Sequence, residues 1–544
     1  MPMMMCLNRY RFMPRDNRQD NCEGRKDNSG RWICLAFAAV AGFVGLATSG
    51  HALPANEIPQ LRADIRALEK KLNDPSFGQS PTTANLRDIT ALGGLRDIIE
   101  TGALSRTGMR AVFKARKNAP LTAQAMDLRL GLVMLSQAYG TKENKAVLDA
   151  QGDNRQALVL LSGEATLADI RALLITTRLQ MAERGTALTL DVPLIIWTDA
   201  GVRLGPGETL LLNRESGAFV LNFGNLVIDR ASIGVAGLEN PGNVDFIPFV
   251  TTAGGGSVQV DGARFTGLGF GHSPKFSGFS ILRQALFAAR YPTHIRNSVF
   301  LDTVGVAISG VADVLVMGNT FRDTRGSAVS LNQSRQARVV SNLFFGQMPT
   351  NAIRIEGGSV NSVVAGNVIL GGERAGIIVR SNSNGTVVRN NIIWRRKGGG
   401  IKLANSDCGR IADNLVMDNG QKGVEIRSSR GSRVAENVIV ANNSAGIWVS
   451  AQTETAQTFV ETNTLISNGS GMAAATGGIV MLRGNDFSVQ FPRLLSGDWA
   501  QQSRQLVQNI RGEEPIVLSN AGLVRDILPS RYCSDGFGTA QGSN

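Results

Sequence analysis

Asparagine recurs at nearly regular intervals between residues 297 and 485, and each recurrence opens a similar unit. Each unit reads Asn-x-apolar, a polar loop, Gly-apolar-x-apolar, another loop and two apolar residues, as in NVILGGERAGIIVRSNSNGTVVRN. A period in the low twenties indicates a solenoid whose neighbouring repeats share one core. The openers are Asn297, Asn319, Asn342, Asn367, Asn391, Asn414, Asn437, Asn463 and Asn485.

The units contain three short runs rich in Val and Ile, separated by Gly, Asn and Ser turns, which predicts three β-strands per unit. Leucine-rich repeats have a similar period, but here the inward positions are Val or Ile and no unit has room for a helix. We therefore predict an all-β solenoid, a right-handed parallel β-helix, with coils stacked about 4.8 Å apart. The repeated asparagines should form an inward ladder that binds backbone groups of the next coil.

Four parts of the chain are expected. Residues 1–52 hold a basic leader and the apolar run ICLAFAAVAGFVGLATSGHA, typical of a secretory signal cut after Ala52; an uncleaved anchor is the alternative. Residues 53–155 form a small helical N-terminal region, with helices where Leu61, Ile65, Leu68 and Leu72 recur and over 108–136. Residues 156–487 form the β-helix, with a capping helix begun by Thr166. Residues 488–544 form a tail that caps the last coil.

Alternation along the Gly-apolar-x-apolar strand sends its x positions outwards. Arg354, Arg380, Lys402 and Arg427 would then lie in a row, a pattern that suits the carboxylates of an anionic polymer, and Trp448 could stack on a sugar ring. A solvated face of mixed charge is the alternative. The full series of outward pairs is Ala307 and Ser309, Ser330 and Asn332, Arg354 and Glu356, Ile378 and Arg380, Lys402 and Ala404, Glu425 and Arg427, Trp448 and Ser450.

Charge also favours an acidic partner. Removing residues 1–52 leaves 56 − 7 = 49 basic and 44 − 4 = 40 acidic residues, a net charge of +9. For an exported protein this suggests an acidic polysaccharide rather than nucleic acid, although such a charge is also ordinary for this length. One loop next to this row is also rich in basic residues. It either lines the polymer-binding groove that the row would form, or is an exposed turn; its residues are Trp394, Arg395, Arg396 and Lys397.

Cysteine and histidine usage gives no sign of a metal or another cofactor. Without the leader, Cys408 and Cys533 remain and could pair in an oxidising compartment. The sequence has no CxxC motif or His/Cys cluster, and His272 and His294 are not spaced as metal ligands.

From residue 156 onward the chain resembles the periplasmic mannuronan epimerases of alginate-producing bacteria. The resemblance is carried by ALVLLSGEATLADI, LNRESGAFVLNFGNLVIDRASIGV, FIPFVTTAGGGSVQVDGARFTGLGF, KFSGFSI and YPTHIRNSVF, and it covers roughly 156–485. It implies a periplasmic or secreted protein, with no membrane span after signal cleavage, that inverts carbon 5 of uronate units in a polymer. The helical N-terminal region could contact exopolysaccharide secretion machinery.

The catalytic centre departs from that family. The family has an Asp-Pro-His-Asp motif where this chain reads Ser330-Leu331-Asn332-Gln333, so Asn332 stands at the position of the family base and cannot accept a proton. Arg354 could bind the uronate carboxylate, although Gly357 is the residue that matches the family arginine. Three other residues could replace the family base: His294, Glu356 and, less favoured, His272. Tyr291, three residues before His294, could contact the substrate.

Three functions remain open from the sequence. The first is an epimerase-like or lyase-like enzyme of exopolysaccharide biosynthesis, with His294, Arg354, Glu356 and Asn332 at the centre and Tyr291, Arg380, Lys402, Arg427 and Trp448 binding polymer. The second is a non-catalytic polysaccharide-binding or export-guide protein. The third, an adhesin-like β-helix, leaves the N-terminal region unexplained. A hydrolase is disfavoured because Glu356 and Glu425 would lie three coil steps, about 14 Å, apart, and another acid such as Asp323 would be needed.

Overall fold

The computed structural model describes residues 58–74, 119–140, 143–153, 155–179, 181–184, 187–283, 292–519 and 533. All of them belong to the second of two units, Met1–Ser49 and Gly50–Asn544. The expected signal segment, residue 291 and all of 75–118 lie outside the described residues. No helix among the described residues is long and apolar enough to cross a membrane.

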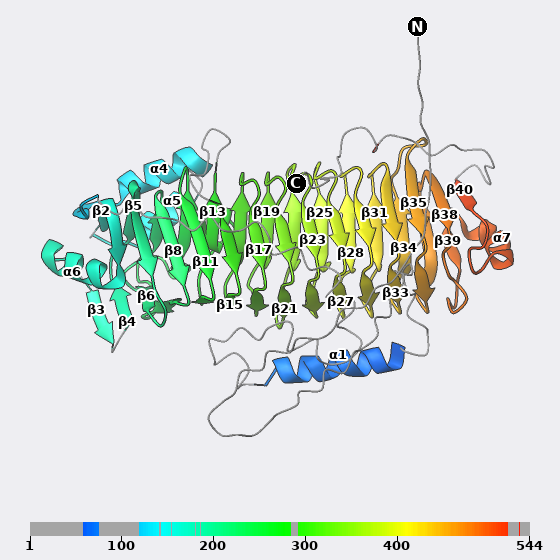
Figure 1. The fold of residues 1–544 in the computed structure, drawn as a ribbon, viewed down its shortest axis with the longest axis horizontal. Helices are drawn as coiled ribbons and strands as arrows, with labels where there is room; N and C mark the ends of the chain where they lie inside the picture. Colours follow the sequence, from blue (N-terminus) through cyan, green and yellow to red (C-terminus); the bar gives the residue numbers. More distant parts are fainter. Residues whose placement is uncertain are drawn as a thin grey trace, which may run out of the picture. The chain divides into compact units, whose positions relative to one another are not determined.

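The second unit is a parallel β-helix, as the repeats predict, and its coils follow one another in a row (Figure 1). Each regular coil contributes one strand to each of three faces, and each strand pairs with its counterpart one coil away. The first face comprises β7 Val220–Asn222, β10 Val250–Ala253, β13 Gly278–Leu282, β16 Gly305–Ser309, β19 Val329–Asn332, β22 Ile353–Glu356, β25 Ile377–Arg380, β28 Ile401–Ala404, β31 Val424–Arg427, β34 Ala445–Ser450, β37 Ser470–Ala475 and β39 Leu495–Gly497.

The second face is joined to the first through the long strands β2 Gln156–Thr166 and β5 Leu194–Leu204. Its strands are β8 Asn225–Asp229, β11 Ser257–Asp261, β14 His294–Arg296, β17 Leu315–Met317, β20 Arg338–Val340, β23 Val363–Ala365, β26 Val387–Arg389, β29 Arg410–Ala412, β32 Ser432–Ala435, β35 Gln457–Glu461, β38 Ile479–Arg483 and β40 Ile516–Ser519.

The third face is a separate sheet. It contains β3 Met181–Arg184, β4 Ala187–Leu190, β6 Thr209–Asn213, β9 Ser232–Ala236, β12 Arg264–Thr266, β15 Val299–Leu301, β18 Thr320–Arg322, β21 Leu343–Phe345, β24 Val368–Leu370, β27 Ile392–Trp394, β30 Leu415–Met417, β33 Val438–Val440 and β36 Thr464–Ile466.

The predicted asparagine ladder is present and buried. Asn391, for example, donates from its backbone N (3.0 Å) and its Nδ2 (2.9 Å) to Oδ1 of Asn414 in the next coil. The first predicted opener is wrong by one residue, because Ser298 and not Asn297 donates to Asn319. Asn297 instead occupies the left-handed turn before it, with φ 51°. Two further ladders accept hydrogen bonds from backbone N–H groups at the other turns of the coils. One consists of Ser residues and begins at Ser334, and the other consists of Asn residues and begins at Asn419.

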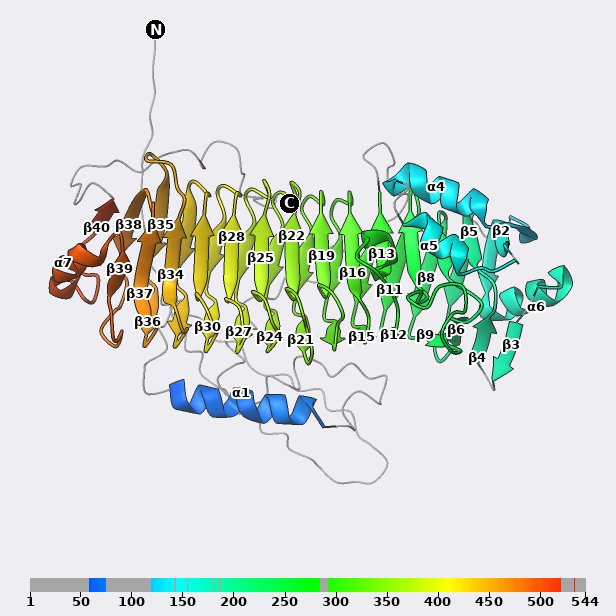
Figure 2. The same ribbon diagram turned by 180° about the vertical axis from the view of Figure 1, so that it is seen from behind.

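Helices cover parts of the outer surface (Figure 2). α1 Ile58–Leu72 packs its apolar stripe on the outward side chains of the third face, including Phe345, Trp394 and Met417. The third-face strands read LFF, VIL, IIW and LVM, so both their sides are apolar and both are buried. The bidentate contact of Arg62 with Asp418, at 2.7 and 3.0 Å, fixes α1 to β30 and its turn.

The N-terminal coils of the first face are covered as well. α4 Arg129–Tyr139 and α5 Asn144–Asp149 pack on outward apolar residues of β5, β7, β10 and β13, such as Leu221 and Leu282. The buried Lys275 Nζ donates to Gly140 O (2.8 Å) and Asn144 Oδ1 (2.7 Å), and its burial lowers its pKa to about 8. From β16 onward the first face carries polar residues, so the cover ends where the candidate site begins.

The two ends of the stack are closed differently. α6 Leu167–Thr177 covers the first coil and begins at Thr166, which forms the predicted cap in a capping box with Asp169. At the other end β39 adds a parallel strand, and β40 pairs antiparallel to β38, next to η3 Ala500–Gln502 and α7 Ser503–Gln508. The helix predicted over 108–136 is wrong for Thr122–Asp127, which form β1, an edge strand antiparallel to β2.

Candidate functional site

The first face between β16 and β37 presents two straight files of outward side chains. Strand pairing places Ser330 beside Arg354 and Asn332 beside Glu356, and the register continues without a shift through β34. Buried and partly exposed residues alternate along β19, β22 and β25, which confirms the outward positions predicted on these strands. Four other members of the predicted series are buried, namely Ala307, Ser309, Ala404 and Ser450. One file runs through Ser330, Arg354, Ile378, Lys402, Glu425 and Trp448, and the other through Asn332, Glu356, Arg380, Ala404, Arg427 and Ser450.

A proximal cluster consists of Arg354, Glu356 and Arg380. Arg380 Nε donates to Glu356 Oε2 at 2.7 Å, and Arg380 Nη2 lies 2.5 Å from the same oxygen. Arg354 Nε lies 3.5 Å from that oxygen but lacks hydrogen-bond geometry, so it has no hydrogen-bond partner among the described residues. One carboxylate therefore sits between two guanidinium groups, and the Arg354 side chain is 34% exposed.

A distal cluster consists of Lys402, Lys422, Glu425 and Trp448. The Glu425 side chain is only 12% exposed, and its oxygens lie 3.2 Å from Lys402 Nζ and 3.8 Å from Lys422 Nζ. Lys422 Nζ also lies 5.1 Å from the centroid of the Trp448 ring. Sequence reasoning missed Lys422, which comes from the loop before β31; its i,i+3 spacing to Glu425 was the available signal.

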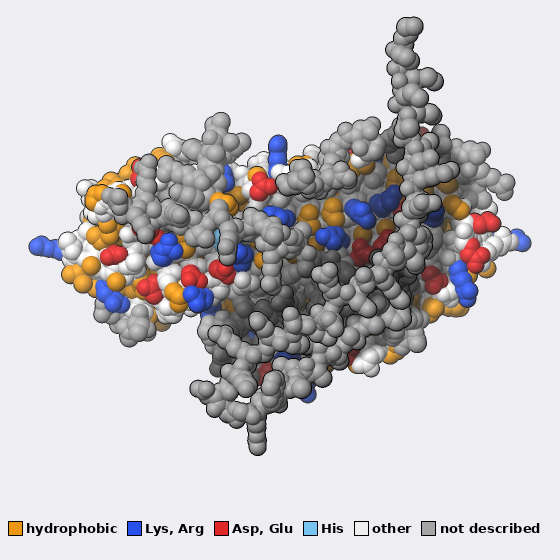
Figure 3. Space-filling model, viewed as in Figure 1, with side chains coloured by type: hydrophobic (Ala, Val, Ile, Leu, Met, Phe, Trp, Pro, Cys, Tyr) orange, Lys and Arg blue, Asp and Glu red, His pale blue; other side chains and the backbone are white. Residues whose placement is uncertain are grey.

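The predicted row of cations is thus largely an array of ion pairs. Arg354, Arg380 and Lys402 each contact a carboxylate, whereas Arg427 is exposed and has no ion pair within the described part of the chain. The side of the coils seen in Figure 3 likewise shows basic, acidic and hydrophobic side chains among one another. The pairs keep the side chains ordered while the first face retains a surplus of positive charge.

Asn332 and Gly357 are sterically linked. Gly357 has φ +64°, and a Cβ at this position would lie 2.0 Å from Asn332 Oδ1. A larger residue at 357 would therefore displace the Asn332 side chain. The side chains that this fold accepts at positions 332 and 357 therefore depend on each other.

The histidines lie apart from the two clusters. His294 is on β14 of the second face, between Gln259 and Leu315, and so is not in either file of the first face. Burial, assisted by Arg296 and opposed by Asp261, lowers its pKa to about 4, which leaves it neutral at pH 7. His272 is exposed in the turn before η2 Pro274–Phe276. Tyr291 lies outside the described residues.

The loop 394–397 does not line the groove. Trp394 is buried under α1, and its Nε1 donates to Asp418 Oδ2 at 3.0 Å. Arg396 is buried, its pKa is lowered to about 10 by burial, and it donates to the carbonyls of Thr350 and Arg374. Arg395 and Lys397 match an exposed turn, where Arg395 pairs with Glu69 at 3.4 Å and Lys397 with Glu373 at 2.8 Å.

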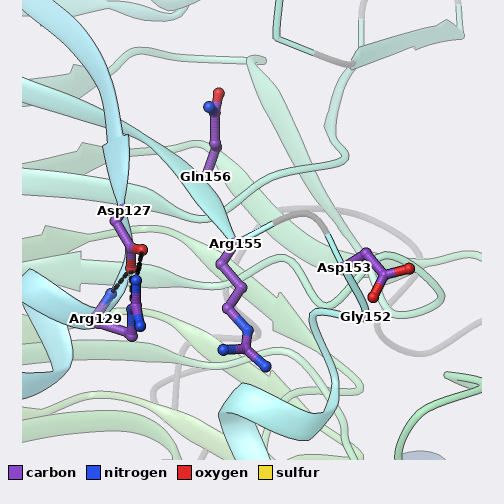
Figure 4. A pocket seen from close by; sticks show the side chains of 6 residues that line it. All are labelled: Asp127, Arg129, Gly152, Asp153, Arg155 and Gln156. Carbon is purple, nitrogen blue, oxygen red and sulfur yellow. Dashed lines mark hydrogen bonds and ion pairs between the residues drawn. The ribbon is translucent and has the colours of Figure 1, made fainter.

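A pocket of about 390 Å³ lies away from these clusters, where β1 meets β2. Asp127 and Arg129 pair with each other on one side of it, while Arg155 and Asp153 extend separately (Figure 4). Its lining is mostly exposed and none of its residues belongs to the two files, so we place the candidate site on the first face instead.

Cys408 and Cys533 form a disulfide, which the sequence left open. Among the described residues, no group of three or more His, Cys, Asp or Glu side chains is arranged to hold a metal ion.

Comparisons with known proteins agree with this architecture. Two crystal structures of the periplasmic alginate epimerase AlgG, a single-substitution mutant and the parent protein, match with TM-scores of 0.59 and 0.51. Their sequence identities are 19% and 18%, and the matches cover 73% and 71% of this chain and 98% and 86% of theirs. This chain shares the fold of AlgG. A doubly substituted AlgG matches at 17% identity over 73% of this chain and 95% of its own, with a TM-score of 0.51.

The family model described as periplasmic copper-binding protein (NosD) matches residues 291–489, which are repeat coils. The described part of these coils has no group of three or more His, Cys, Asp or Glu side chains arranged to hold a metal ion, and Cys408 is in a disulfide. A search of the curated proteins found no match.

Proposed function

We propose that this protein is exported and acts on an anionic exopolysaccharide during its synthesis or secretion. The observation that carries the proposal is the pair of files on the first face, where a basic, partly aromatic surface continues over consecutive coils. A linear polymer can follow such files because each coil offers it an equivalent position. The AlgG-like fold and the disulfide support an extracytoplasmic, periplasmic or secreted protein.

The polymer would lie along the first face with its carboxylates towards Arg354, Arg380, Lys402 and Arg427. Guanidinium groups bind carboxylates with two parallel hydrogen bonds, and the Arg354 side chain is 34% exposed on this face. Trp448 would pack against the apolar face of a sugar ring. The third face offers less room for a polymer in the middle coils, because α1 covers it.

The chemistry we propose starts at the proximal cluster. A uronate carboxylate bound by Arg354 and Arg380 is neutralised, which acidifies the neighbouring C5–H bond. The same binding draws guanidinium groups away from Glu356, and a carboxylate that loses cationic partners becomes a stronger base. Glu356 would then accept the C5 proton, a role that Asn332 cannot perform and for which His294 lies on another face.

Two products are compatible with that step. In elimination, the C5–H electrons form a C4=C5 double bond, the C4–O bond breaks, and Glu356 returns its proton to the leaving oxygen. In epimerisation, C5 is instead reprotonated from the opposite side of the sugar, which needs a second proton donor. An epimerase-like or lyase-like enzyme is thus our leading proposal.

A non-catalytic polysaccharide-binding or export-guide protein is the second candidate. Asn332 at the position of the family base favours it, as do the ion pairs that already occupy Glu356. Both the enzyme and the guide protein could contact the secretion machinery. α1 and α4 use their apolar stripes within the chain, so that contact would involve exposed side chains such as Leu130 and Val133 of α4.

The test is to incubate the protein with polymannuronate and other acidic polysaccharides in deuterated water and to follow C5 by proton NMR. Deuterium at C5 or inverted units indicates an epimerase, and unsaturated ends indicate a lyase; both should disappear in Glu356→Gln. Glu461→Gln is the matched control, since Glu461 pairs with Arg433 on the second face. Binding without any chemical change, lost in Arg354→Ala, indicates the guide protein. Absence of both binding and chemistry refutes the proposed function.

A further inference from the structure

The second face carries an apolar stripe on its outer side. Val339, Val364 and Val388 point into the core, so the residues that flank them on their strands point outwards. From β17 to β29 most outward side chains are apolar and follow one another in register from coil to coil, and contiguous apolar residues on an outer surface indicate a contact site. This second-face stripe consists of Leu315, Met317, Val340, Val363, Ala365, Val387 and Ala412, and the charged outward residues on the same strands are Arg338, Arg389 and Arg410.

The packing of the stripe differs from that of the other outer surfaces. Leu315 and Val340 are each only 2% exposed, although both point away from the core. Neither belongs to the clusters that α1, α4 and α5 form with the other two faces. Val363 and Val387 are half-buried and remain available to a packing partner. A contact on the second-face stripe is therefore not supplied by these helices.

The disulfide anchors a later part of the chain at one end of the stripe. Cys408 lies in the turn between β28 and β29, two residues before Arg410. β40 ends at Ser519, four strand pairings away from β29 along the stack, or about 19 Å. The disulfide thus places Cys533 four coil steps back from β40, at the rim of the second face where the stripe begins.

The residues that follow Cys533 match the stripe in length and chemistry. Residues 534–544 read SDGFGTAQGSN and lie outside the described residues. When extended, they reach about 36 Å, whereas the stripe spans four coil steps from β29 to β17, about 19 Å. Their one charged residue, Asp535, comes two positions after Cys533. Its counterpart is Arg410, which is exposed and has no ion pair among the described residues.

We infer that residues 534–544 dock on the second-face stripe and that the Cys408–Cys533 disulfide is the anchor that holds them there. The anchor makes docking intramolecular, so a short segment with few apolar residues can remain bound. The second face is then occupied by the chain itself, and this occupation depends on an oxidising compartment in which the disulfide forms. The inference is independent of the polymer contacts proposed for the first face.

Two contacts define the docked segment. Asp535 pairs with Arg410 where the stripe begins. Phe537 packs on the half-buried side chains of Val387 and Val363, which lie one and two coil steps from Arg410 in the same file. Four residues of chain after the anchor reach about 13 Å, enough to cover two coil steps of about 10 Å.

The test is limited proteolysis of the full chain with chymotrypsin, which cleaves after Phe537. Release of residues 538–544 is followed by mass spectrometry, and a synthetic peptide of residues 534–544 gives the rate for an unprotected segment. In the oxidised protein Phe537 should be cleaved about 10-fold more slowly than in the peptide, because its buried side chain must leave the stripe first. Val387→Asp should restore most of the rate of the peptide.

Ile378→Asp is the matched control, because Ile378 is an outward, half-buried residue on the first face of the same coil as Val387. It should leave the cleavage rate unchanged, whereas Cys533→Ser should raise the rate as Val387→Asp does. If Val387→Asp does not fold, judged by circular dichroism, Val363→Ser provides the same comparison. Cleavage after Phe537 that is as fast as in the free peptide, or equally slow in the parent protein and the stripe variant, overturns the inference and leaves the proposed function intact.

Discussion

The asparagine ladder allows one stability prediction to be worked through in full. Asn414 is 1% exposed and makes five hydrogen bonds. Its Oδ1 accepts from the backbone N and Nδ2 of Asn391, and its Nδ2 donates to Val388 O, Ala412 O and Asn437 Oδ1. Replacing it with Ala removes both sets of contacts at a site closed to water.

The size of the effect follows from the groups left behind. The backbone N of Asn391 loses its acceptor, and a buried unsatisfied group costs about 1–3 kcal/mol. Asn391 Nδ2 also loses one hydrogen bond but still donates to Val364 O and Arg389 O. The carbonyls of Val388 and Ala412 lose the hydrogen bond from Asn414 Nδ2 but keep those of the strands, so this loss costs less free energy. Neighbouring ladder residues and water that enters the space recover part of the cost, and we expect Asn414→Ala to lower the free energy of unfolding by about 3–5 kcal/mol.

The assay is urea unfolding followed by circular dichroism, with Asn443→Ala as the control. Asn443 is exposed on the neighbouring coil, so its replacement should change stability by less than about 0.5 kcal/mol. Equal stability of the two variants would refute the assignment of the ladder as the main polar support of the coils.

Three further outcomes test other contacts. Asp418→Asn should release α1, seen as faster tryptic cleavage at Lys70 and Lys71 with unchanged melting of the coils, whereas Asp64→Asn, whose partner is Gln60, should not; equal cleavage rates would contradict the role of the Arg62–Asp418 contact. Gly357→Ala should destabilise the protein by about 1–3 kcal/mol, and adding Asn332→Ala should recover part of the loss because the clash is removed; strictly additive effects would show that the two residues do not interact. The pKa of His294 is lowered to about 4, so the unfolded chain binds a proton more readily than the folded chain, and stability falls as the pH drops from about 6.5 to 4. His294→Gln should remove this part of the acid sensitivity, measured by urea unfolding at several pH values. An identical pH dependence in both proteins would contradict the prediction.

Much of the first face could be predicted because β-strand alternation is local. Once the repeat was aligned, the outward positions followed, and the structure places Arg354, Glu356, Arg380, Lys402 and Trp448 in the expected files. Alignment of the repeats could not show which charged side chains of the first face contact each other. The Glu356–Arg380 pair and the approach of Lys422 to Trp448 depend on side-chain geometry between coils.

Errors in the prediction arose where local sequence serves a distant contact. His294 follows a motif of the family resemblance, but its strand belongs to the second face, away from Arg354. Trp394 and Arg396 look like groove residues in NIIWRRKGGG, yet α1 and the carbonyls of neighbouring turns bury them. The segment Thr122–Asp127 was predicted as part of a helix but pairs with β2, because a tertiary partner outweighs local propensity.

The sequence by itself determined that this chain is a stack of three-stranded coils, because a repeated pattern of Asn, Gly and Val/Ile specifies each turn and each inward side chain through contacts with the next repeat. It also determined which residues point outwards. Only the tertiary structure decided which outward surface stays open. Among the described helices, α1 covers the third face and α4 and α5 cover the first coils of the first face, and none of them covers the polar stretch that follows. The sequence could not show this, because these helices lie far along the chain from the strands on which they pack.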